Sequence, residues 1–121
     1  MNNKKTIVLG ASGNPSRYSY LAVEKLIRYG HSVIAIGKKE GEIGQTNIIT
    51  RHPNEKEVDT VTLYLNPELQ KQYYDYIVSL HPKRLIFNPG TENVELYDLA
   101  KLNGIEPVEA CTLVLLGTGQ Y

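Results

Sequence analysis

Short apolar runs alternate along this chain with longer segments whose apolar residues recur at helical spacing. The short runs are rich in Val, Ile and Leu, which is typical of buried β-strands. They predict strands over residues 5–9, 31–36, 47–50, 59–65, 84–87 and 105–108. The longer segments predict helices over residues 18–29, 67–80, 92–102 and 111–116. Strand therefore alternates with helix through most of the chain.

Turn and capping residues mark the ends of these elements. Gly30 and Gly104 follow predicted helices, and glycine commonly ends a helix. Asn66 and Pro67 open the second helix, because Asn caps free N–H groups and Pro suits the first helical position. The polar stretch 37–44 predicts a loop. The apolar face of the first helix is expected to contain Leu21, Ala22, Leu26 and Tyr29.

The alternation predicts the fold class. Strands joined by helices form right-handed βαβ units, which build a parallel sheet covered by helices on both faces. We expect one Rossmann-like α/β domain over residues 1–121, with a parallel sheet of five or six strands. Ligands of such domains bind at the carboxyl ends of the strands. Those ends are rich in Gly, Pro, Asn, Ser or Lys, and they cover residues 10–17, 37–39, 65–67 and 88–90.

The turn after the first strand carries the strongest functional signal. A strand enters the Gly/Ser/Asn loop 10–17, and a helix follows directly. The loop and the helix start present unpaired N–H groups and a partial positive charge, which suit a phosphate. We expect the ligand to contact this loop and the neighbouring strand ends. The candidate residues are Gly10, Ser12, Gly13, Asn14, Pro15, Arg17, Tyr18, Ser19, Gly37, Lys38, Lys39, Asn66, Pro67 and Gly90.

The loop departs from the dinucleotide fingerprint. A Gly-x-Gly-x-x-Gly motif starting at Gly10 would need glycines where Ser12 and Pro15 stand. The acidic residue that holds the ribose of NAD is replaced at the end of the second strand by Lys38 and Lys39. Lysines there favour a phosphorylated ribose. Two ligands fit, coenzyme A with its 3′-phosphate and, less well, NADP with its 2′-phosphate.

The stretch 8–19 resembles the small CoA-binding Rossmann proteins, which are related to the CoA-binding domain of the succinyl-CoA synthetase alpha subunit. The likeness lies in Gly10-Ala11-Ser12, followed by a polar run with Pro15 and then by Arg17 and Ser19. Lys39 takes the lysine position that follows the family's second strand. Residues 59–67 resemble the next strand and its Pro-started helix, and 109–111 resemble the family's terminal Asp-Arg-Cys.

The resemblance implies that the domain binds CoA or an acyl-CoA through the loop 10–17. The chain departs from the family pattern in three places. Asn88-Pro89-Gly90 replaces a Gln-x-Gly-like segment, Ala110 replaces an Arg, and Leu65-Asn66 stands where Arg residues are common.

Composition narrows the classes of partner. The 13 basic and 13 acidic residues give a formal net charge of zero, which argues against a general nucleic-acid or membrane-surface binder. Cys111 is the single cysteine, so an internal disulfide is excluded and a reducing compartment fits. We expect a cytoplasmic protein whose partner is a small nucleotide ligand. The apolar tail 113–116 leaves a homodimer open.

Candidate catalytic groups do not form a recognisable set. No Ser/His/Asp arrangement is evident, Cys111 is expected to be a buried small hydrophobe, and His31, His52 and His81 have no metal-ligand spacing. We therefore expect binding rather than catalysis, and no metal. An NADP-linked oxidoreductase-type domain and an interaction protein with an unoccupied nucleotide fold remain the alternatives.

Overall fold

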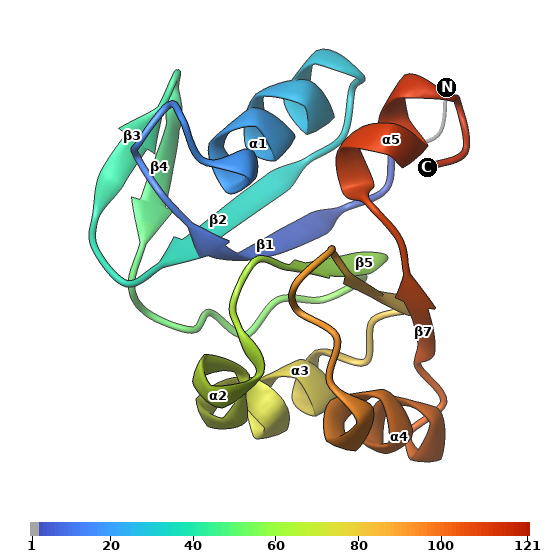
Figure 1. Cartoon of the computed structure of the whole chain (residues 1–121). Helices are drawn as coiled ribbons and strands as arrows, with labels where there is room; N and C mark the ends of the chain where they lie inside the picture. Colours follow the sequence, from blue (N-terminus) through green and yellow to red (C-terminus); the bar gives the residue numbers. More distant parts are fainter. Residues whose placement is uncertain (1–2) are drawn as a thin grey trace.

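A seven-stranded sheet forms the centre of the computed structural model, which describes residues 3–121 (Figure 1). Its strands follow the spatial order β3-β4-β2-β1-β5-β6-β7. All neighbours pair in parallel except β3 and β4, which are antiparallel. The strands are β1 (Thr6–Ala11), β2 (Val33–Gly37), β3 (Gly41–Ile43), β4 (Thr46–Ile49), β5 (Thr60–Leu63), β6 (Arg84–Phe87) and β7 (Glu106–Glu109).

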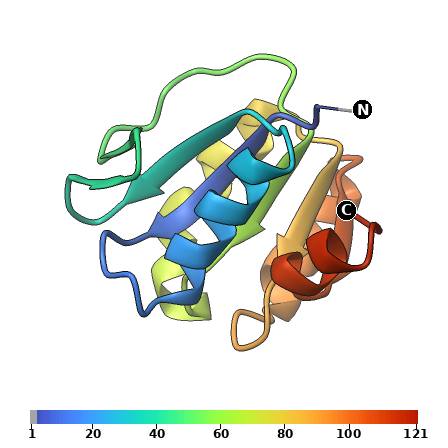
Figure 2. The same cartoon turned by 90° about the horizontal axis from the view of Figure 1, so that it is seen from above.

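Helices cover both faces of the sheet, as the alternation predicts (Figures 1 and 2). One face carries α1 (Tyr18–Arg28) and α5 (Thr112–Gly117). The other carries α2 (Pro67–Gln70), the 3-10 helix η1 (Lys71–Tyr73), α3 (Tyr74–Leu80) and α4 (Val94–Leu102). Apolar side chains from β1 and β6 fill both interfaces, because successive strand residues point to opposite faces. β5 adds Val61 and Leu63 to the α2–α4 face, and its buried Thr62 meets Thr112 of α5 on the other face.

The predicted strand number of five or six is wrong, and the missing strand is β3. Its residues lie in the polar stretch 37–44 that predicts a loop. Gly41 and Glu42 have low strand propensity, yet they pair with Ile48 and Asn47 of β4 in a hairpin. Ile43 is buried by this pairing. Tertiary packing, rather than local propensity, creates the strand.

The predicted helices form, but one is divided and the buried face of another differs from the prediction. The predicted helix 67–80 is divided into α2, η1 and α3. In α1, Leu21 and Tyr29 are 39% and 37% exposed, so they do not belong to the buried face. Ser19 and Val23 are buried there instead, together with Ala22 and Leu26 as expected. The buried face of α1 therefore includes Ser19 and Val23, which are not part of the predicted apolar face.

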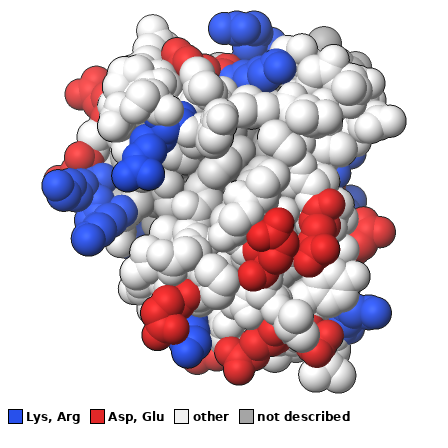
Figure 3. Space-filling model, in the orientation of Figure 1, with Lys and Arg blue, Asp and Glu red and all other residues white. Residues whose placement is uncertain are grey.

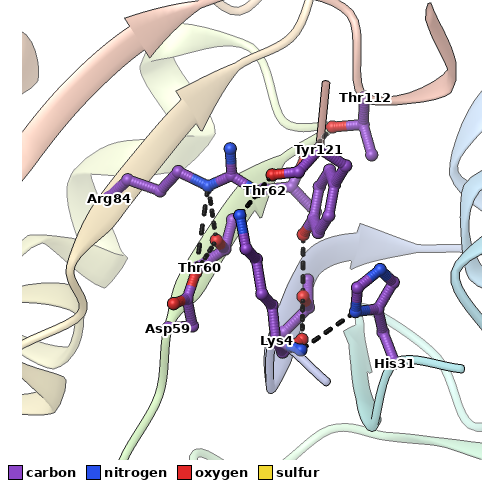
Figure 4. A network of polar contacts seen from close by, with 9 residues as sticks. Lys4, His31, Asp59, Thr60, Thr62, Arg84, Thr112 and Tyr121 are labelled. Atoms are coloured by element: carbon purple, nitrogen blue, oxygen red, sulfur yellow. Dashed lines mark hydrogen bonds and ion pairs between the residues drawn. The ribbon is translucent and has the colours of Figure 1, made fainter. Parts of the chain in front are cut away.

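The C-terminal segment packs on the α1 face of the sheet, and its last residue covers the amino end of β1. Leu116 in α5 is buried in the core, whereas Val114 of the apolar tail 113–116 stays exposed. The Tyr121 ring lies at the start of β1 and shares a hydrogen bond of 2.7 Å with the Thr6 hydroxyl (Figure 4). The Arg84 guanidinium is 4.2 Å from the ring centroid, and the His31 ring centroid is 5.0 Å away.

His31 gives the folding stability a pH dependence. The Lys4 amide donates a hydrogen bond of 2.9 Å to His31 Nδ1, which needs a neutral imidazole. Burial lowers the pKa of His31, the charges of Lys4 and Arg84 lower it further, and Asp59 opposes them. The unfolded chain therefore binds this proton more readily, so stability is complete above the ordinary pKa of 6.5 and falls below it.

We expect His31→Gln to flatten the stability profile of the protein between about pH 7 and pH 5. Urea unfolding at a series of pH values measures this, and His52→Gln, which alters an exposed histidine, is the matched control. Equal slopes for the wild type and His31→Gln would show that His31 does not carry the effect.

Candidate functional site

A cleft of about 1120 Å³ lies at the carboxyl edge of the sheet, where the loops after β1, β2, β5 and β6 meet. This is the edge at which parallel α/β sheets bind ligands. The cleft is lined by Gly10, Ala11, Ser12, Gly13, Asn14, Ser16, Arg17, Tyr18, Ser19, Lys38, Lys39, Glu40, Tyr64, Leu65, Asn66, Leu69, Pro89, Gly90 and Thr91.

Most of the candidate residues come together in this cleft. They are Gly10, Ser12, Gly13, Asn14, Arg17, Tyr18, Ser19, Lys38, Lys39, Asn66 and Gly90. Pro15, Gly37 and Pro67 lie beside it in the chain but are not lining residues. The other lining residues are absent from the candidate list: Ala11, Ser16, Glu40, Tyr64, Leu65, Leu69, Pro89 and Thr91. Four of them, Ala11, Ser16, Leu65 and Pro89, lie within the predicted strand ends, and Glu40 and Thr91 directly follow such an end. The sequence offers no such signal for Tyr64 and Leu69.

The loop after β1 is held in shape by its own polar groups. Asn14 Oδ1 accepts hydrogen bonds from the Ser16 amide at 3.0 Å and the Ser16 hydroxyl at 2.8 Å. The Asn14 amide donates to Ser12 Oγ at 3.1 Å, and the Arg17 amide donates to the Asn14 carbonyl at 3.0 Å. Ser12 and Asn14 therefore shape the loop with their side chains before any ligand is considered.

The start of α1 is open toward a ligand. Arg17 is the N-cap residue, it makes no side-chain capping bond, and the first turn contains no acidic residue. By contrast, Asn66 Oδ1 caps α2 through the Leu69 amide, as predicted, and Asn93 Oδ1 caps α4 through Leu96. An uncapped N-terminus keeps N–H donors and the positive end of the helix dipole available for an anion.

Positive charge gathers at the same end of the cleft. Arg17, Lys38 and Lys39 line it, and Glu40 supplies the one carboxylate among its lining residues. The space-filling view shows basic side chains at the top and along the left with a few acidic ones beside them, other acidic side chains at the right and bottom, and uncharged surface between (Figure 3). The formal net charge of zero thus conceals a local cationic site.

Glycines allow the strand ends to approach one another. Gly10 has a φ of +96°, and a Cβ there would lie 2.9 Å from the Tyr64 carbonyl group at the end of β5. A Cβ on Gly37 would overlap the Ala11 carbonyl oxygen at the end of β1. Gly13 is less constrained, since its nearest neighbour would be the Glu42 carbonyl at 3.9 Å. Gly10 and Gly37 therefore have a structural reason to be glycine.

The far end of the cleft is less polar. Leu65, Leu69 and Pro89 line it, and Leu69 is 44% exposed. The Tyr64 phenol is buried on the other face of the sheet, beside Thr112 of α5, and this burial raises its pKa well above the usual range. This end of the cleft therefore presents apolar side chains and no charged group to a ligand.

Asn88, part of the segment that departs from the family pattern, turns into the protein. Its Nδ2 donates to Thr62 Oγ1 at 2.6 Å and to the Leu63 carbonyl at 2.8 Å, while its Oδ1 accepts from the Thr112 amide at 2.9 Å. The residue joins β5, β6 and α5. The turn that follows presents Pro89, Gly90 and Thr91 to the cleft.

Other chemically reactive groups lie away from the cleft lining. Cys111 is partly exposed, which corrects its expected burial, and it directly precedes α5. Within residues 3–121, no three His, Cys, Asp or Glu side chains converge as a metal ion requires. Tyr97 and Lys101 have the Tyr-x-x-x-Lys spacing of short-chain dehydrogenases, but they lie on α4 outside the cleft lining.

In the described part of the chain, no helix has the length and hydropathy needed to cross a membrane.

Solved structures share this fold over almost the whole chain. An uncharacterized protein is 52% identical, with a TM-score of 0.97 and complete coverage of both chains. A conserved hypothetical protein from Pyrococcus furiosus is 26% identical, with a TM-score of 0.80, covering 92% of this chain and 97% of that one. A Thermus thermophilus structure is 20% identical, with a TM-score of 0.84 and coverages of 98% and 91%. A comparison with curated proteins found no match.

Fold and cleft together define a Rossmann-like domain with a cleft at the carboxyl edge of its sheet. The family model described as "CoA binding domain" matches residues 4–117. The chain therefore belongs to this CoA-binding domain family, as the motifs around Gly10, Arg17 and Lys39 predict.

The close approach at Gly37 can be tested by adding one methyl group. We expect Gly37→Ala to cost about 3 kcal/mol of unfolding free energy, because the new Cβ meets backbone that cannot rotate away. Gly13→Ala should change stability by less than about 1 kcal/mol. Urea unfolding of both variants is the measurement, and equal losses would refute the steric argument.

Proposed function

We propose that this protein binds coenzyme A, free or acylated, in the cleft at the carboxyl edge of its sheet, and that it catalyses no reaction by itself. The observation that carries the proposal is the uncapped start of α1 in the same cleft as Arg17, Lys38 and Lys39. Membership of the CoA-binding domain family supports the choice of ligand.

The pyrophosphate of CoA is assigned to the loop 10–17 and the first turn of α1. The N–H groups at an uncapped helix start bind phosphate oxygens, and the helix dipole favours their negative charge. Arg17 lies at that positive end, where a cation is unfavourable by roughly 0.3–1 kcal/mol unless an anion is bound. A bound pyrophosphate removes this cost.

The 3′-phosphate of CoA is assigned to Lys38 and Lys39. Both follow β2, which lies directly beside β1 in the sheet, so they flank the loop that receives the pyrophosphate. The pantetheine arm then extends past β5 toward β6, where Leu65, Leu69 and Pro89 offer less polar surface. The cleft volume of about 1120 Å³ suits a ligand of this size.

The proposal is limited to binding because of the side chains that line the cleft. Among them, Glu40 is the one acidic group, and the described lining includes no His or Cys. Glu40 lies on the cationic side, where a carboxylate can accept a hydrogen bond from a ribose or adenine group. None of these residues forms a nucleophile–base pair of the kind that covalent catalysis uses.

NADP is the second candidate, and the same lysines favour it. Its 2′-phosphate would occupy the position assigned here to the 3′-phosphate of CoA. The polar loop 10–17 lacks the dinucleotide fingerprint, which makes NADP the weaker candidate. A titration that compares the two ligands separates them directly.

We expect calorimetric titration to show binding of CoA, weaker binding of dephospho-CoA and weaker binding of NADPH. Arg17→Ala should weaken CoA binding about tenfold, since a charge-assisted contact contributes about 1.5–3 kcal/mol at most when it is well formed. Lys38→Ala with Lys39→Ala should reduce the preference for CoA over dephospho-CoA.

Arg28→Ala is the matched control, because it removes the same side chain from the opposite end of α1. It should leave CoA affinity unchanged. Absence of binding at millimolar CoA would refute the proposal, and a clear preference for NADPH would replace it with the second candidate.

A further inference from the structure

A buried amide joins the two loops that form the less polar end of the cleft. Gln70, at the end of α2, is fully buried. Its Nε2 donates a hydrogen bond of 2.7 Å to the Leu65 carbonyl and another of 2.8 Å to the Thr91 carbonyl. Leu65 follows β5 and Thr91 follows β6, and both residues line the cleft. One side chain thus fixes the distance between two walls.

The orientation of this amide is set by Asn93. Asn93 Nδ2 donates to Gln70 Oε1 at 2.9 Å and to the Tyr74 hydroxyl at 2.8 Å. Because Oε1 is engaged as an acceptor, Nε2 must face the two carbonyls. Asn93 Oδ1 meanwhile caps α4 through the Leu96 amide at 3.3 Å. Both donors and the acceptor of Gln70 are therefore used.

We infer that Gln70 is a positioning residue for the ligand: it holds the walls after β5 and β6 at the separation needed by the part of the ligand that lies beyond the phosphates. The inference rests on the proposed binding of CoA. Gln70 is not a cleft-lining residue, so its effect is transmitted through the Leu65 and Thr91 backbone.

Sheet order makes this role separable from phosphate binding. The phosphate sites follow β1 and β2, whereas the joined walls follow β5 and β6, which are the next two strands across. Neighbouring strands are about 4.8 Å apart. A ligand that ends at its phosphates therefore does not reach past the β5 wall, while the pantetheine arm of CoA does. Loss of the Gln70 hydrogen bonds should therefore weaken the binding of CoA and leave the binding of the shorter ligand nearly unchanged.

The test compares CoA with adenosine 3′,5′-bisphosphate, which carries the 3′-phosphate and the first of the two 5′-phosphates of CoA and lacks the second 5′-phosphate and the pantetheine arm. Gln70→Met retains a long unbranched side chain and removes both donors. We expect calorimetry to show about tenfold weaker CoA binding and less than twofold change for the bisphosphate, as the loss of one or two hydrogen bonds permits. Gln72→Met is the control, because Gln72 is exposed on the adjoining turn.

A second variant covers the case in which Gln70→Met does not fold. Asn93→Asp keeps the Oδ1 atom that caps α4, removes the Nδ2 donor and places a carboxylate beside Gln70 Oε1. The Gln70 amide must then turn or lose its partner, so the same selective loss of CoA affinity is expected. Near-ultraviolet circular dichroism and thermal unfolding show whether each variant has the native fold.

The outcomes are distinct. Selective weakening of CoA binding supports the positioning role. Unchanged CoA affinity in a folded variant overturns it, and so does an equal loss for both ligands, which would indicate general destabilisation. If the wild-type protein binds the bisphosphate but not CoA, the inference fails together with the assigned path of the arm. If it binds neither, the proposed function itself fails.

Discussion

The close backbone contact of β1 with its two neighbours is the constraint on which the site depends. At the carboxyl end of β1, Gly10 lies against the Tyr64 carbonyl, and Gly37 of β2 lies against the Ala11 carbonyl. Because both residues are glycines, no Cβ pushes the backbones of these strand ends apart. β1 is the middle strand of the sheet, so the loop that follows it leaves the sheet at its centre. Ile7 and Leu9, both fully buried, anchor the strand that presents this loop. An apolar core and two glycines together place the loop 10–17 beside Lys38 and Lys39.

The other half of the cleft is organised by buried amides rather than by glycine. Asn88 and Gln70 are 2% and 0% exposed, and each side chain takes part in three hydrogen bonds that join separate segments of the chain. A buried amide left without partners costs about 1–3 kcal/mol. Such groups therefore add little net stability but tolerate only one arrangement of the loops around them. These hydrogen bonds give the loops after β5 and β6 a defined arrangement as walls of the cleft.

Sequence reasoning recovered the features that depend on local pattern. Alternating apolar runs predicted the parallel strands, and Asn66 was correctly interpreted as a helix cap. It failed where distant residues decide the outcome. β3 forms because β4 pairs with it, and the burial of Gln70 depends on carbonyls at residues 65 and 91. A buried glutamine in a short helix has no periodic signature, so its role becomes visible only when the two loops are seen together.

The distribution of charge explains how a protein with no net charge can favour an anion. Arg17 stands at the positive end of α1, and Lys38 and Lys39 face the same cleft with Glu40 as the one lining carboxylate. Each of these placements is slightly unfavourable without a ligand, because like charges repel and a cation opposes the helix dipole. By contrast, α2 and α4 have Glu68 and Glu95 in their first turns, where a negative charge is favourable. The start of α1 therefore combines a cationic N-cap residue with two lysines in the same cleft, an arrangement that a bound anion would make favourable.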